Sequence, residues 1–194
     1  MISQTPTTES ERSAEVAAVV LVRYGRMPQV ARFAVEAATL QQYEGGFVRN
    51  DSVVVESERG PEAGRVLQVI REGIHEANKP NTGRLLRKTT IEDEDMLLQQ
   101  QQRAAAEFAE WHQRITDWQL QLQLIDLEWT LDDQNVILYV LNDQNAETTR
   151  LALLAAAAGM GIVQVQPVSA EGVIPPEPKG GGCGSGGCSN GGCH

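Results

Sequence analysis

The chain has 194 residues, of which 41% are hydrophobic and 22% charged, so it is long enough to bury a core in one domain or in two small ones. Its formal net charge of −10 disfavours direct nucleic-acid binding, because a negative surface repels phosphate backbones. No run of about 18 apolar residues and no signal-peptide pattern occurs, so we expect a cytoplasmic protein without a membrane span.

The N-terminal half predicts a small β subdomain over residues 15–86. The polar leader, residues 1–14, has no apolar period and is expected to be disordered. Four apolar runs predict short strands, at 16–22, 29–35, 53–56 and 65–70. A turn is expected at 59–64, and 72–86 has the composition of a connecting loop. Short strands separated by glycine turns predict a small twisted barrel or curled sheet.

The second half, residues 87–168, predicts an α-β-β-α-β layer, which makes the whole chain α+β. Thr89 and Glu92 have the spacing of a capping box at the start of a long helix. Apolar residues then recur at three- and four-residue steps, interrupted at Gln101, and are expected to face the core: Leu97, Ala104, Phe108, Trp111, Ile115 and Trp118. Further elements are expected in the order strand, strand, helix, strand, at 122–131, 136–141, 146–158 and 161–168.

Local signals refine these elements. The apolar phase slips between Leu124 and Ile125, which indicates either a β-bulge or burial on both faces of the strand. Asn145 can cap the second helix, and Gly159 can end it.

All three cysteines lie in the last twelve residues, within a tail that we place at 169–194. Cys183, Cys188, Cys193 and His194 follow the spacing C-x-x-x-x-C-x-x-x-x-C-H. Three thiolates and one imidazole fit a tetrahedral zinc site, and the thiolates alone fit three corners of an iron–sulfur cluster. Two interpretations stay open: a metal or cluster site, or a flexible tail with reactive thiols.

The sequence shows no pattern of an enzyme, and we assign no catalytic residue. His75 lies in the expected loop and His112 lies beside Trp111 in the long helix, with no nucleophile motif around either. No phosphate-binding G-x-x-x-x-G-K-[ST] motif occurs. A short basic patch precedes four acidic residues and is interpreted as a solvated linker: Arg84, Arg87 and Lys88.

A family resemblance is carried by stretches that occur in order between residues 16 and 168. They read Val53-Val-Val-Glu-Ser-Glu-Arg-Gly-Pro-Glu-Ala-Gly-Arg-Val66, Arg87-Lys-Thr-Thr-Ile-Glu-Asp93, and Leu124-Ile-Asp-Leu-Glu-Trp-Thr-Leu-Asp132 leading to Ile137-Leu-Tyr139. In these stretches the chain resembles the bacterial YaaT (RicT) family, which carries the conserved region named after a yeast polymerase-suppressor protein (PSP).

This resemblance implies a cytoplasmic, non-enzymatic regulatory scaffold that joins two small helical partner proteins. The resulting complex promotes messenger-RNA maturation by an endoribonuclease and influences developmental phosphorelays. The resemblance also implies an iron–sulfur cluster with cysteines of this subunit among its ligands. Two alternatives stay open: a metal-handling protein whose tail receives or delivers zinc, nickel or an iron–sulfur cluster, and an RNA-binding module that uses the second sheet.

The chain departs from the family pattern near its end. Family members continue from the last strand into Q-I-G-x-R-D and a G-P-C-G-type segment, whereas this chain reads Gln164-Val-Gln-Pro-Val-Ser-Ala-Glu-Gly. Since the first cysteine here is Cys183, the cluster ligands of the family cannot be carried over position by position. Arg150 matches the arginine of the family's F-R-x-L helix, but Thr149 replaces the phenylalanine.

Overall fold

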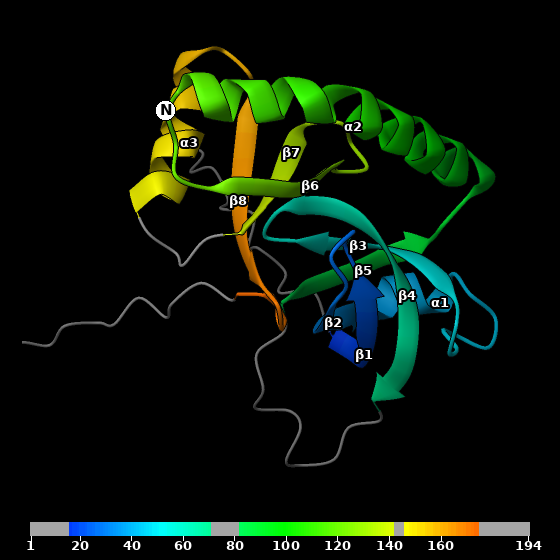
Figure 1. Ribbon diagram of the computed structural model, residues 1–194. Helices are drawn as coiled ribbons and strands as arrows, with labels where there is room; N and C mark the ends of the chain where they lie inside the picture. Colours follow the sequence, from blue (N-terminus) through cyan, green and yellow to red (C-terminus); the bar gives the residue numbers. More distant parts are fainter. Residues whose placement is uncertain (1–15, 71–81, 142–145, 175–194) are drawn as a thin grey trace, which may run out of the picture.

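The computed structural model describes residues 16–70, 82–141 and 146–174, which form two β-sheets and three helices (Figure 1). This confirms the expected α+β fold. In chain order the elements are β1 (Val16–Tyr24), β2 (Gln29–Glu36), α1 (Ala37–Gln41), β3 (Ser52–Ser57), β4 (Gly60–Ile70), β5 (Gly83–Lys88), α2 (Ile91–Asp117), β6 (Gln123–Trp129), β7 (Asn135–Leu141), α3 (Ala146–Ala157), β8 (Ile162–Ser169) and β9 (Gly172–Val173).

The first five strands close into a ring in the order β1-β2-β5-β3-β4, with β4 pairing back onto β1. We call these strands the ring. Alternating side chains fill its interior, including Val20, Val22, Phe33, Val53 and Val55. Closure requires glycine at one point, because a Cβ on Gly83 would lie 1.8 Å from the backbone oxygen of Glu56.

Two expectations for this half are wrong. The turn expected at 59–64 is shorter, because β4 already begins at Gly60, which pairs with Ser57 at the end of β3. The end of the loop expected at 72–86 is strand β5, and residues 71–81 lie outside the described residues. The short helix α1 was not expected.

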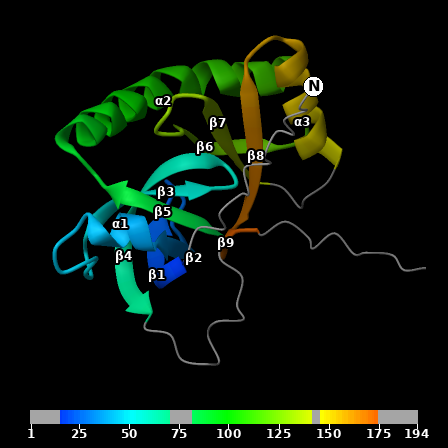
Figure 2. The same cartoon turned by 180° about the vertical axis from the view of Figure 1, so that it is seen from behind.

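The second sheet has the order β6-β7-β8-β9, with β7 and β8 parallel and connected through α3. Helices α2 and α3 cover one face of this sheet, and the ring lies against the other (Figures 1 and 2). The helix side buries Trp111, Leu127, Leu138 and Leu151. The expected order α-β-β-α-β is confirmed, and β9 adds a short strand that was not expected.

Helix α2 begins one residue later than expected. Its capping box is formed by Thr90 and Asp93, not by Thr89 and Glu92. The cause is the ring, because the backbone N–H of Thr89 still donates to the oxygen of Ser52 at 3.0 Å. The predicted core position of Trp111 is confirmed, since its side chain is only 3% exposed.

Two local predictions in the second sheet are confirmed, and one falls outside the described residues. The register of β6 against β7 shifts between Leu124 and Asp126, which shows that the phase slip is a bulge at Ile125. Gly159 follows α3 with φ of +74°. Asn145, the expected cap of α3, is not among the described residues.

Candidate functional site

Four polar side chains lie together where the ring meets the second sheet, and all but the half-buried Glu128 are buried. Arg59 comes from the turn between β3 and β4, Glu62 from β4, Glu128 from β6 and Tyr139 from β7. The Arg59 guanidinium donates through Nε to Glu62 at 3.2 Å and through Nη1 to the Tyr139 hydroxyl at 3.0 Å. Tyr139 in turn donates to Glu128. We call these four residues the junction cluster.

Burial and charge pairing act against each other in the junction cluster. Burial raises the pKa of Glu62, although the Arg59 guanidinium opposes the shift. Burial also raises the pKa of Tyr139, and the carboxylate of Glu128 raises it further. For Arg59, burial lowers the pKa, but the neighbouring carboxylates more than offset this and raise it. Arg59 therefore stays charged between two acidic groups.

Backbone contacts connect the ring to the second sheet at the same place. The backbone oxygen of Arg59 accepts from Asn135 at 2.7 Å and from Gln164 at 3.2 Å. The N–H of Leu131 donates to the oxygen of Pro61 at 2.8 Å. The turn between β3 and β4 is therefore attached to the second sheet through its backbone as well as its side chains.

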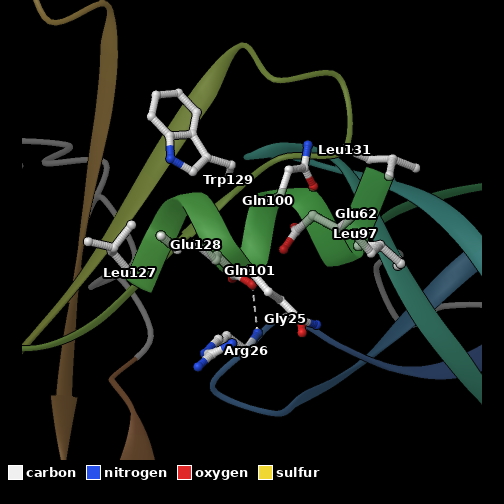
Figure 3. Close-up of a pocket in the computed structure, with 12 residues that line it drawn as sticks. Gly25, Arg26, Glu62, Leu97, Gln100, Gln101, Leu127, Glu128, Trp129 and Leu131 are labelled. Carbon is white, nitrogen blue, oxygen red and sulfur yellow. Dashed lines mark hydrogen bonds between the residues drawn. The ribbon is translucent and has the colours of Figure 1, made fainter. Parts of the chain in front are cut away.

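A cavity of about 230 Å³ lies beside the junction cluster, between the ring, α2 and β6 (Figure 3). Glu62 and Glu128 line it together with Gln100 of α2 and Arg26 of the turn after β1. The N–H of Arg26 donates to Glu128 at 2.8 Å, the bond that is dashed in Figure 3. Gln100 is buried, although the sequence pattern indicated Gln101 as the polar residue that interrupts the apolar stripe of the helix.

A second candidate surface is the face of α2 that points away from the core. Figures 1 and 2 both show α2 along the outside of the molecule, and of the described residues only the turn between α3 and β8 rises above it, at the end of α2 next to α3. Five uncharged residues on this face are exposed and follow one another at three-, four- or seven-residue steps: Ile91, Leu98, Gln102, Ala105 and Ala109. We call them the outer stripe of α2.

The predicted ligands of the tail, Cys183, Cys188, Cys193 and His194, lie outside the described residues, as does His75. His112 is exposed on α2. Within residues 16–70, 82–141 and 146–174, no group of three or more His, Cys, Asp or Glu side chains is arranged to hold a metal ion. In the same residues, no helix is long and apolar enough to cross a membrane.

The basic patch belongs to strand β5, so its interpretation as a linker is wrong. Each cation of the patch is paired with a carboxylate. Arg84 binds Glu56 at 2.6 Å, Lys88 binds Asp51 at 2.8 Å, and Arg87 binds Asp93. The patch therefore connects β5 to its neighbours and to the start of α2.

The junction cluster was missed at the level of the sequence. Arg59 and Glu62 fell within the expected turn, and Tyr139 within an apolar strand. A usable signal was Glu128, a carboxylate placed between the apolar Leu127 and Trp129. Three of the stretches that carry the family resemblance, 53–66, 124–132 and 137–139, contribute the four residues of this cluster.

Comparison of the chain with protein-family models, with curated proteins and with solved structures gave no match.

Proposed function

We propose that the protein is a non-enzymatic adaptor that binds a helical partner protein along the outer stripe of α2. The observation that carries the proposal is a stripe of exposed, uncharged residues on a helix whose opposite face packs on the second sheet. Between Ile91 and Leu98 the exposed carboxylates of Glu94 and Asp95 lie beside this stripe. Leu98, near the start of the stripe, is 55% exposed. Helix α2 has 27 residues, which corresponds to about 40 Å of surface along which a second helix can lie.

The charges beside the stripe define the chemistry of the partner. Glu94 and Asp95 are exposed next to it. A partner helix that carries Lys or Arg beside an apolar stripe would complement this face. The net charge of −10 would also attract such a basic partner at long range.

The state of the junction cluster supports a binding role over a catalytic one. The guanidinium of Arg59 is engaged by Glu62 and Tyr139, and Glu128 accepts from Tyr139 and Arg26. These groups hold the two sheets together and are not arranged as a nucleophile beside a base. The resemblance to the YaaT (RicT) family points the same way, toward a cytoplasmic scaffold of small helical proteins that assists an endoribonuclease in messenger-RNA maturation.

The proposal is tested by affinity capture from the cytoplasm of the source cells with three forms of the chain. The parent should retain one or two small helical proteins in stoichiometric amounts. Leu98→Glu should lose them, because the new charge would be buried without a partner in the apolar contact. Leu153→Glu is the matched control, since Leu153 of α3 is 66% exposed but lies on another helix, and it should retain them.

Loss of the same proteins with both variants, or with neither, would contradict docking on the outer stripe. Self-association of the chain through Leu98, without other proteins, would replace the partner by a second copy and also contradict the proposal.

The cysteine tail favours a second candidate function, metal handling. Its donor set of three thiolates and one imidazole, from Cys183, Cys188, Cys193 and His194, fits a zinc ion, and the thiolates fit part of an iron–sulfur cluster. Such a site would add to the adaptor function without replacing it.

A further inference from the structure

Gln100 leaves one buried acceptor without a partner. Its amide nitrogen donates to the backbone oxygen of Thr130 at 2.7 Å. Since a backbone oxygen can only accept, this bond fixes the amide with its nitrogen toward Thr130. The amide oxygen has no partner among the described residues, although Gln100 is only 6% exposed. A buried acceptor of this kind is stabilised when a donor reaches it.

Gln100 lines the cavity between the ring, α2 and β6, and the junction cluster contributes more acidic than basic groups around this cavity. Glu62 and Glu128 both face it, and Arg59 is the one cation of the cluster. The guanidinium of Arg26 does not restore the balance, because it is bound to a third carboxylate, Asp126, at 2.7 Å. Two cations thus face three carboxylates, which leaves an excess of one negative charge.

Figure 3 shows Gln100, Glu62 and Glu128 around one space, each coming from a different element. The walls between them are apolar, with Leu97, Leu127 and Ala104 among the lining residues. The volume of about 230 Å³ lies just below the range of roughly 300–1,000 Å³ that is usual for drug-sized ligands. The occupant is therefore small, with a polar head and a short hydrocarbon stem.

We propose that this cavity binds a small organic cation that carries N–H donors on an ammonium or guanidinium head. The head donates to lone pairs that remain on Glu62 and Glu128. It also donates to the unpaired amide oxygen of Gln100, which is enclosed in the structure and reaches the head after a turn of the Gln100 side chain toward the cavity. The stem lies against the leucines. This inference is independent of the adaptor function, since it concerns the opposite side of α2 and the isolated protein.

The test is a titration of the purified, full-length protein with butylammonium and with butylguanidinium, followed by ¹H–¹⁵N correlation spectra. Tetramethylammonium serves as a cation without donors, and 1-butanol as a stem without charge. We expect saturable shifts of the Gln100 side-chain amide and of the Gly25 and Arg26 backbone amides with the two donor cations alone. Gln100→Met, which conserves volume, should weaken binding about tenfold or more. Gln102→Met, on the outer stripe, should bind like the parent.

Shifts that do not saturate would overturn the proposal, because they report only the net charge. The same holds for shifts that spread over the backbone amides of residues with exposed carboxylates, such as Glu94 and Asp95. Equal binding of tetramethylammonium would overturn it as well. If Gln100→Met does not fold, the decision rests on the parent spectra: no saturable shift of the Gln100 amide refutes the site.

Discussion

Gly25 shows how closely the ring approaches the junction cluster. It has φ of +76°, and a Cβ at this position would lie 2.9 Å from Nη2 of Arg59. Gly45 has a similar φ of +81° but no atom within 4 Å of a Cβ. The two glycines share the backbone requirement, so a comparison between them isolates the effect of the contact with Arg59.

We predict that Gly25→Ala destabilises the protein more than Gly45→Ala does. The left-handed backbone alone should cost about 1–2 kcal/mol at either position. At Gly25 the methyl group must also displace the buried Arg59, and the disturbed ion pair should bring the total to about 3–5 kcal/mol. Urea unfolding of both variants measures the difference. Equal losses would show that Arg59 moves aside without disturbing the cluster.

The sequence did not reveal the junction cluster, because its members are far apart along the chain. Arg59 and Tyr139 are 80 residues apart, so nothing in the local pattern around either indicates the other. Gly-Pro after Arg59 is a strong turn signal, but β4 begins there, because pairing with β3 and attachment to the second sheet extend the strand. A buried charge can be suspected from one sequence, but its partner cannot be named.

The start of helix α2 depends on Asp93, which forms its capping box with Thr90. Hydrogen bonds from Arg87 lower the pKa of this carboxyl to about 2, and the N–H of Thr90 contributes to the shift. Since the pKa of Asp93 is lower in the folded protein, its contribution to stability is present above the unfolded value of 3.8. It is lost as the pH falls from that value toward 2.

We predict that Asp93→Asn lowers the free energy of unfolding by about 1–2 kcal/mol at pH 7. About 1 kcal/mol comes from the helix cap, and the pair with Arg87 adds at most about 1 kcal/mol because Arg87 is 41% exposed. The loss of stability between pH 4 and pH 2 should be shallower in this variant. Asp95→Asn, on an exposed position of the same turn, should follow the parent curve. Identical pH curves for Asp93→Asn and the parent would contradict the role of Asp93.

Helices and strands that form because of side-chain periodicity were predicted well from the sequence. Strands that form because distant segments pair were predicted poorly. The phase slip at Leu124 and Ile125 correctly indicated a bulge, because the signal lies within the strand. Strand β5 was missed, because Arg84, Arg87 and Lys88 resemble a solvated loop until Glu56, Asp93 and Asp51 are placed beside them. The capping box was displaced by one residue for the same reason, a backbone bond to the ring.

At the scale of the whole molecule, the cysteine tail makes a prediction that does not depend on the fold. Protein prepared anaerobically and reduced should retain a transition metal or a cluster, because thiolates bind soft ions with loss of protons. The variant with Cys183→Ser, Cys188→Ser and Cys193→Ser should lose the metal and melt like the parent. Elemental analysis and thermal unfolding of both proteins provide the test.

Absence of metal from the reduced parent, under conditions in which a known site is loaded, would leave a tail of reactive thiols. Equal metal content in the parent and the triple variant would place the site elsewhere. Either result would remove metal handling through this tail from the functions of the protein.

Photo-cross-linking in the source cells tests whether the outer stripe of α2 binds a helical partner. A photoreactive side chain is placed at Leu98 or, as the control, at Leu153, and the cross-linked peptides are identified by mass spectrometry. We expect position 98 alone to capture one or two small proteins, through a helix with Lys or Arg beside its apolar stripe. No cross-link from position 98, or the same products from both positions, would contradict it.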